Sequence, residues 1–240
     1  MLLEVERVSK RFGGLTAVSE VSFAVAEGQV VGLIGPNGAG KTTLFNVIAG
    51  VLRPSSGSIR FAGREIAGLR PYRICRAGLC RTFQIVKPFR NLTVLENVVV
   101  GAFTRVRERR AAYEDALKIV EATGLARWGD SIAQALPIGL RKRVEVARAL
   151  ATRPRMILLD EVMNGLNPTE LREMMDLIRR LNSTGLTVLL IEHVMAAVMD
   201  LCQRIVVVHH GEKIADGSPE AVTRDPRVVE AYLGEDYLMR

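Results

Sequence analysis

Eight consecutive residues from Gly35 to Thr42, GPNGAGKT, match the pattern G-x-x-x-x-G-K-[ST]. Glycines in such a loop let successive backbone N–H groups surround a triphosphate, because no side chain blocks their approach. Lys41 adds a positive charge near the β- and γ-phosphates, and the Thr42 hydroxyl can coordinate Mg²⁺. A chance glycine-rich turn would not explain the complete pattern. The predicted phosphate-binding residues are Gly35, Pro36, Asn37, Gly38, Ala39, Gly40, Lys41, Thr42 and Thr43.

Two adjacent acids, Asp160 and Glu161, directly follow the apolar stretch Met156 to Leu159. Acids at the end of a strand suit the magnesium-dependent attack of water on a phosphate. We expect Asp160 to hold the metal, usually through water, and Glu161 to orient or deprotonate the attacking water. The alternative is a helix start, where the helix dipole also favours acids. The phosphate-loop pattern upstream favours the catalytic interpretation.

A histidine, His193, stands just beyond the apolar run from Leu186 to Ile191. A lone histidine is more often structural than catalytic. Here its strand follows the acid-bearing strand by one helix, which puts the histidine at the same edge of a parallel sheet as the phosphate loop. The sequence therefore predicts His193 as part of the same site.

An aromatic residue, Phe12, precedes the turn Gly13-Gly14. An exposed ring just ahead of a nucleotide loop could stack on a purine base, and a ring on a turn could equally pack into the core. Local sequence leaves both interpretations open.

Short apolar runs alternate with helical patterns around these residues. The patterns predict strands at residues 2–8, 20–26, 29–34, 57–61, 156–159, 186–191, 204–208 and 213–216, and helices at 42–49, 93–102, 111–123, 141–151, 168–182, 219–223 and 227–233. The first two strands should pair across the Gly13-Gly14 turn, and the last two should form a hairpin. These elements predict an α/β fold, a P-loop NTPase core with a mostly parallel sheet and N-terminal antiparallel strands.

The middle third of the chain has helical periodicity with few strand signals. Thr93 and Glu96 match the T-x-x-E capping box at the start of its first helix. We therefore expect one domain over 1–240, with a nucleotide-binding core at 1–84 and 155–240 and an inserted helical subdomain at 85–154.

Composition narrows the functional classes. No apolar run approaches the about 18 residues that cross a bilayer, and charged residues among the first eleven argue against a secretory signal, so we expect a cytosolic protein. The formal net charge is +7. A basic patch could meet nucleic acid or an anionic membrane, but no aromatic residues are interleaved for stacking on bases, which favours solvated helix faces.

The motifs occur in a fixed order, and nearly the whole chain resembles the ATP-binding subunit of an ABC transporter. Gln84 corresponds to the family's Q-loop glutamine, MILLDE to its Walker B strand, residues 164–167 to its D-loop, and His193 to its switch histidine. Phe12 falls where the family stacks an aromatic ring on adenine. The resemblance implies ATP and Mg²⁺ as cofactors, catalytic roles for Lys41, Gln84, Glu161 and His193, and metal coordination by Thr42, Gln84 and Asp160, partly through water.

The segment Leu136-Pro137-Ile138-Gly139-Leu140 occupies the place of the family signature LSGGQ, and only Leu136 and Gly139 match it. The family uses this segment to contact the γ-phosphate held by a partner subunit. The resemblance therefore implies that Gly139 acts in trans. The missing serine hydroxyl puts the strength of that contact in question.

At a finer level, the strings RTFQIVKPFRNLTVLENVVVGA and AYLGE resemble the branched-chain amino-acid importer subgroup, whose relatives also handle urea, amides and aromatic acids. The resemblance implies a peripheral protein on the cytoplasmic face of the inner membrane. Its implied partners are permease subunits, a second ATPase subunit and, indirectly, an extracytoplasmic solute-binding protein, with no nucleic acid. A soluble ABC ATPase acting on nucleic acid or ribosomes is the alternative. A non-catalytic nucleotide binder is less consistent with Glu161 and His193.

Overall fold

A six-stranded sheet carries the motifs in the computed structural model, which describes residues 1–82 and 88–238, with side chains as far as Tyr232. Its strand order is β10-β9-β3-β8-β7-β6, parallel throughout except for the antiparallel β9–β10 hairpin. The strands are β3 (Val30–Ile34), β6 (Leu79–Arg81), β7 (Met156–Asp160), β8 (Thr187–Ile191), β9 (Arg204–His209) and β10 (Glu212–Gly217). The mostly parallel core and the closing hairpin predicted from the sequence are confirmed.

A second sheet is antiparallel, in the order β2-β1-β4-β5. Its strands are β1 (Leu3–Phe12), β2 (Leu15–Val25), β4 (Ser56–Phe61) and β5 (Arg64–Glu65). The predicted pairing of the first two strands is confirmed, but both continue to the Gly13-Gly14 turn. Register shifts after Val5 and Val8 interrupt the alternation of side chains, and the tip of the hairpin is exposed. The hydrophobic pattern that predicts strands is therefore missing there.

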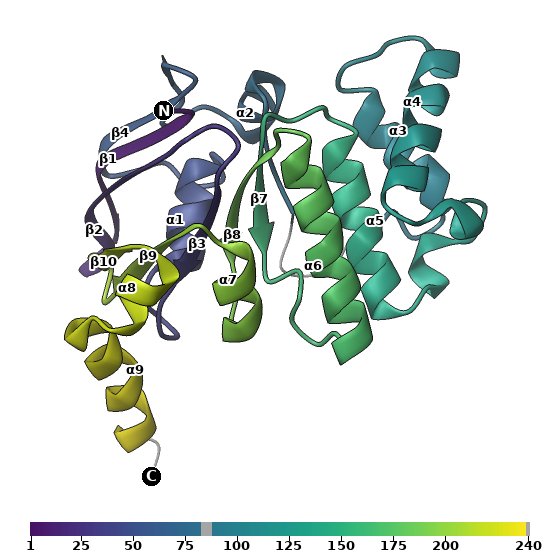
Figure 1. Cartoon of the computed structure of the whole chain (residues 1–240). Helices are drawn as coiled ribbons and strands as arrows, with labels where there is room; N and C mark the ends of the chain where they lie inside the picture. Colours follow the sequence, from purple (N-terminus) through teal and green to yellow (C-terminus); the bar gives the residue numbers. More distant parts are fainter. Residues whose placement is uncertain (83–87, 239–240) are drawn as a thin grey trace.

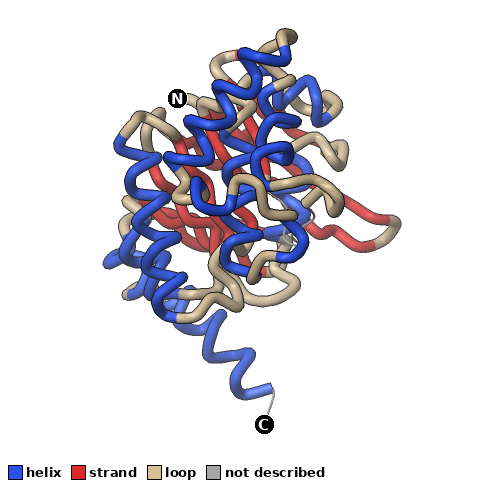
Figure 2. The backbone as a smooth tube through the Cα atoms, turned by 90° about the vertical axis from the view of Figure 1, so that its right-hand side faces the viewer, coloured by secondary structure: helices blue, strands red, loops and turns tan. Residues whose placement is uncertain are grey.

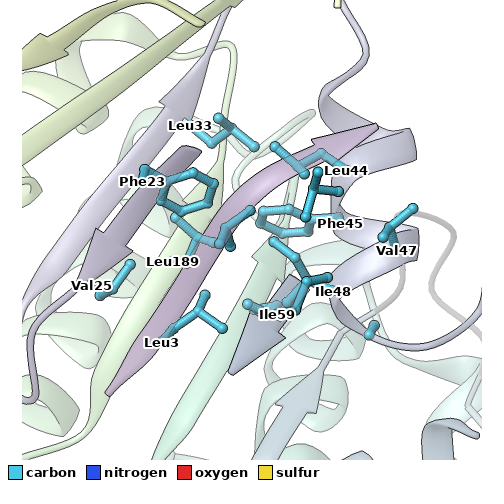
Figure 3. Packing of buried hydrophobic residues seen from close by; sticks show 14 of the residues in the cluster. Leu3, Phe23, Val25, Leu33, Leu44, Phe45, Val47, Ile48, Ile59 and Leu189 are labelled. Carbon is cyan, nitrogen blue, oxygen red and sulfur yellow. The ribbon is translucent and has the colours of Figure 1, made fainter. Parts of the chain in front are cut away.

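Helix α1 (Lys41–Ile48) packs its apolar side between the two sheets (Figure 1). Leu44, Phe45 and Ile48 share one buried cluster with residues of both sheets, among them Leu3 and Leu189 (Figure 3). Each of these side chains is at most 1% exposed. This core attaches the helix that follows the phosphate loop to both sheets.

The helices of the middle third have a hydrophobic cluster of their own. They are α3 (Val94–Ala102), α4 (Arg109–Ala122) and α5 (Ile138–Leu150), with short 3₁₀ turns at Ala126–Trp128 and Ala133–Ala135. The predicted capping box is confirmed, since Glu96 N–H donates to Thr93 Oγ1 at 3.1 Å and Thr93 N–H donates to Glu96 Oε2 at 2.8 Å. α5 begins three residues before the predicted start, because Pro137 at the N-cap position is compatible with a helix beginning directly after it.

The remaining helices are α2 (Pro71–Ala77), α6 (Pro168–Ser183), α7 (Met195–Leu201), α8 (Pro219–Thr223) and α9 (Pro226–Leu238). Figure 2 shows helices in front of the strands when the molecule is seen from the side of α3 and α4, and α9 extending away from the body. Among the helices and strands, the sequence interpretation missed α2, α7, β5 and β6. For α2 the signal was present, with Pro71 at the first helical position and Gly78 in the left-handed conformation after the end.

Candidate nucleotide site

Three parallel strands end at the same edge of the six-stranded sheet. In the register, Gly32 of β3 pairs with Leu190 of β8, and Asp160 of β7 pairs with Ile191 of β8. The phosphate loop begins directly after β3, Glu161 follows Asp160 at the end of β7, and His193 lies two residues beyond the end of β8. Parallel topology therefore brings together residues from positions 35, 160 and 193, as the sequence predicts.

The phosphate loop needs glycine for a reason beyond access to phosphate. A Cβ on Gly35 would lie 2.0 Å from the carbonyl oxygen of Val208, and one on Gly40 would lie 2.3 Å from the carbonyl oxygen of Ala17. Gly40 also has φ +97 at the N-cap of α1. The loop thus runs against the backbone of two neighbouring strands, and only glycine fits this conformation and this space.

Lys41, the first residue of α1, is only 6% exposed. Its Nζ donates to the carbonyl oxygens of Gly35 at 2.5 Å and Pro36 at 2.6 Å. The ammonium group therefore links the start of α1 to the start of the loop through charge-assisted hydrogen bonds. It also lies among the residues that would surround the phosphates.

A cavity of about 400 Å³ opens at this edge of the sheet. It is lined by Phe12, Leu15, Ala17, Asn37, Gly38, Ala39, Gly40, Lys41, Thr42, Thr43, Glu161 and His193. Ten of these residues belong to the site predicted from the sequence. Leu15 and Ala17 were not predicted, because their role comes only from the position of the β2 hairpin beside the loop.

The catalytic pair predicted from the sequence is in contact. Nε2 of His193 lies 3.0 Å from Oε1 of Glu161, and because an ionised carboxylate only accepts, the histidine N–H donates. Glu161 is 9% exposed and has φ +51, a conformation that residues with side chains seldom adopt. Such strain often occurs at functional sites. A largely buried carboxylate oriented by a histidine at the edge of a cavity can accept a proton from water.

Asp160 is buried behind this pair. Its Oδ2 forms an ion pair with Arg81 Nη2 at 2.6 Å, and Arg81 Nη1 donates to Asn46 Oδ1 of α1 at 2.6 Å. Burial raises the pKa of the Asp160 carboxyl, and the hydrogen bond to Arg81 opposes that shift. The other oxygen, Oδ1, is buried with no hydrogen-bond partner among residues 1–82 and 88–238.

That orphaned oxygen fits a magnesium site. Mg²⁺ prefers oxygen ligands and usually retains several waters, and Thr42, whose side chain carries a hydroxyl group, is among the residues that line the cavity. The Arg81 contact was not predicted from the sequence. No local sequence pattern indicated it, because the pairing of β6 with β7 that places Arg81 beside Asp160 is a contact between distant segments.

Phe12 is 45% exposed and lines the cavity, so it does not pack in the core. Lys10 Nζ lies 5.0 Å from the centre of its ring. The ring position is compatible with stacking on a base that enters the cavity.

Gly139 lies elsewhere, at the second position of α5. A Cβ there would come within 2.6 Å of Oε1 of Glu170, on α6. No α5 residue is among the described residues that line the cavity. Gln84, the remaining predicted site residue, falls outside the described residues.

Two known protein families match this chain, one over most of its length and one near its C-terminus. The family described as "ABC transporter" matches residues 18–164, and the family described as "Branched-chain amino acid ATP-binding cassette transporter" matches residues 212–237. In the part of the chain that the structure describes, no helix is long and apolar enough to cross a membrane.

Curated relatives match over nearly their whole length. The high-affinity branched-chain amino acid transport ATP-binding protein BraF of Pseudomonas aeruginosa is 43% identical, and LivG of Escherichia coli is 40% identical, each match covering 98% of both chains. The crystal structure of the ADP conformation of MJ1267, an ATP-binding cassette of an ABC transporter, matches with a TM-score of 0.88 at 34% identity, over 97% of this chain and 98% of that one. The chain therefore belongs to the ABC transporter family, as a nucleotide-binding subunit whose ATPase activity is coupled to transport.

Proposed function

We propose that this chain powers the import of branched-chain amino acids, with Glu161 as the general base for ATP hydrolysis. The observation that carries the proposal is the contact between Glu161 and His193 in the cavity that the phosphate loop lines. The substrate class is supported by the names of the relatives and by the C-terminal family match. Related small polar solutes, such as amides, urea and aromatic acids, are the other candidates.

In the proposed reaction, Glu161 takes a proton from water as the water attacks the γ-phosphorus, giving ADP and phosphate. His193 orients that carboxylate. The loop N–H groups and Lys41 stabilise charge on the phosphate oxygens, and Phe12 stacks on the adenine. Gln84 completes the catalytic set as an expectation from the sequence.

Magnesium would be held by Thr42, Asp160 and Gln84, partly through water, and when bound it would neutralise charge between the β- and γ-phosphates. The unpartnered Oδ1 of Asp160 supports this assignment. Arg81 competes for the same carboxylate through its other oxygen.

We further propose that two such subunits enclose ATP between them, with Gly139 of one chain facing the nucleotide of the other. No residue of α5 is among the described residues that line this chain's own cavity, which supports a role in trans. Permease subunits would hold the pair at the cytoplasmic face of the inner membrane and, with a solute-binding protein, select the substrate.

The separate hydrophobic cluster of α3, α4 and α5 supports a division into a core at 1–84 and 155–240 and a helical subdomain at 85–154. A nucleic-acid or ribosome-directed ATPase has no support among the whole-length relatives.

The test is Glu161→Gln, which keeps the size and hydrogen bonding of the side chain but removes the base. In the chain reconstituted with its permease partners, we expect MgATP to bind normally and turnover to fall ~10²–10⁴-fold. Uptake of radiolabelled leucine into proteoliposomes should stop in parallel. Turnover near that of the wild type would show that Glu161 is not the base.

A further inference from the structure

One buried cation has no place in the site described so far. Lys142, on α5 one turn beyond Gly139, is 6% exposed. Its Nζ donates to the carbonyl oxygen of Glu161 at 3.0 Å and to that of Asn164. An ammonium is costly to bury unless it is well paired, so these two carbonyls are the partners that keep it there.

The two carbonyls belong to the turn that carries the catalytic carboxylate. Glu161 occupies the left-handed region in this turn, and its N–H donates to the carbonyl oxygen of Ile191 at 2.9 Å. Because a residue with a side chain resists this conformation, the surrounding structure must hold it. Lys142 contributes the contact from the carbonyl side of Glu161, and the strand β8 contributes the contact from the N–H side.

A second charged group lies behind the turn. Glu192 is 2% exposed, and its Oε1 accepts the N–H of Met163 at 2.8 Å, whereas Oε2 has no hydrogen-bond partner within the described residues. Burial lowers the pKa of Lys142, and the carboxylates of Glu192, Glu161 and Glu145 oppose that shift. The turn is thus held between the ammonium group of Lys142 on α5 and the buried carboxyl group of Glu192.

We propose that Lys142 is a positioning residue for hydrolysis, which fixes the Glu161 turn and ties it to the helix whose N-terminus serves the partner's nucleotide. This inference rests on the proposed function of Glu161. It adds a mechanical consequence, since any movement of α5 relative to β7 must act on the carbonyl of Glu161 through a buried ammonium.

The experiment compares Lys142→Met with Lys142→Arg in the chain assembled with its permease partners. Methionine keeps most of the length of the side chain but removes its charge and its hydrogen-bond donors, whereas arginine keeps the charge and the donors. Arg143→Met is the matched control, because Arg143 sits at the next position and pairs with Glu173 instead of the turn. The readouts are kcat, KM for ATP, and affinity of the subunit for the fluorescent analogue TNP-ATP.

We expect Lys142→Met to lower kcat at least about tenfold, with TNP-ATP affinity within about twofold of the wild type, because every residue that lines the cavity is unchanged. Lys142→Arg should recover most of the rate, and Arg143→Met should stay within about twofold. If Lys142→Met fails to fold, the double variant Lys142→Met with Glu192→Gln removes the uncompensated carboxylate and should show the same loss of kcat.

A kcat within twofold of the wild type in a folded Lys142→Met or double variant would overturn the inference, as would equal losses in the Lys142→Met and Lys142→Arg variants. Glu161→Gln, measured beside them, distinguishes failure of the inference about Lys142 from failure of the proposed function. If Glu161→Gln is inactive while Lys142→Met is normal, only the inference about Lys142 fails. If Glu161→Gln turns over normally, the proposed function itself fails.

Discussion

Two helices, α1 and α5, are alike near their N-termini but differ in their relation to the nucleotide cavity. Each has a buried lysine in or just after its first turn, Lys41 and Lys142, each 6% exposed and each donating to two backbone carbonyls. Lys41 binds the loop that directly precedes its own helix. Lys142 binds a turn 19 and 22 residues further along the chain.

This difference supports the proposal that the start of α1 serves a site within its own chain, whereas the start of α5 serves the site of a second chain. The start of α1 lines the cavity together with its loop. The start of α5 lies beside Glu170, and none of its residues is among the described residues that line that cavity. Changes at α1 should therefore alter nucleotide binding by one chain, and changes at α5 should alter turnover by the pair.

The largest expected effect is at the start of α5. A carboxylate in Gly139→Asp would lie near the partner's γ-phosphate, and two like charges ~4 Å apart cost about 4 kcal/mol at an effective dielectric constant near 20. Turnover of the assembled transporter should fall roughly a thousandfold, while the separate chain keeps its ATP affinity. Gly139→Asn, similar in shape without the charge, is the control. Undiminished hydrolysis in Gly139→Asp would remove the partner role from α5.

Just before α1, Gly40→Ala should lower the folding stability of the single chain. The new Cβ would lie 2.3 Å from the Ala17 carbonyl oxygen in a left-handed conformation. Strain and crowding together should lower the free energy of unfolding by roughly 3 kcal/mol in urea titrations without nucleotide. Gly38→Ala has the same sign of φ but open space around the Cβ, so it should lose only about 1 kcal/mol. Equal losses would show that crowding by Ala17 is unimportant.

Glu192, the buried acid that accepts the N–H of Met163, should make the stability of the chain depend on pH. Burial raises the pKa of Glu192 from 4.5 to about 7, against the N–H of Met163 and the charge of Lys142, which lower it. A raised pKa in the folded state means that this group's stabilisation is complete below about pH 4.5 and is lost as pH rises through about 7. Glu192→Gln should remove roughly 2–3 kcal/mol of that pH dependence.

The measurement is urea unfolding of the nucleotide-free wild type and Glu192→Gln at several pH values between about 5 and 8. The difference in free energy of unfolding between the two proteins should change with pH in the direction that favours the variant as pH rises. A constant difference would mean that Glu192 titrates normally in the folded chain.

The smallest effect is expected at the rim of the cavity. Loss of a stacking ring in Phe12→Ala should weaken ATP binding by roughly 1–3 kcal/mol, with little change in stability because the ring is 45% exposed. Phe12→Tyr should bind as the wild type does. Calorimetric titration of both variants measures this, and unchanged affinity in Phe12→Ala would exclude base stacking.

The sequence alone determined the main motifs of the nucleotide site, because each motif is made of residues close together in the chain. The loop from Gly35 to Thr42, the capping box at Thr93 and the acids Asp160 and Glu161 can each be recognised from a short stretch of consecutive residues. Parallel strand order then follows from alternating strands and helices, so the joint position of Glu161 and His193 could be predicted.

Contacts between residues distant in the chain were decided only by the tertiary structure. No local pattern indicates that Arg81 pairs with Asp160, that Lys142 binds the carbonyl of Glu161, or that Ala17 crowds Gly40. The length of β1 and β2 also escaped prediction, since register shifts erase the alternation that marks a strand. Each of these features depends on which surfaces meet after the sheets and α1 have packed, and that packing is a property of the whole chain.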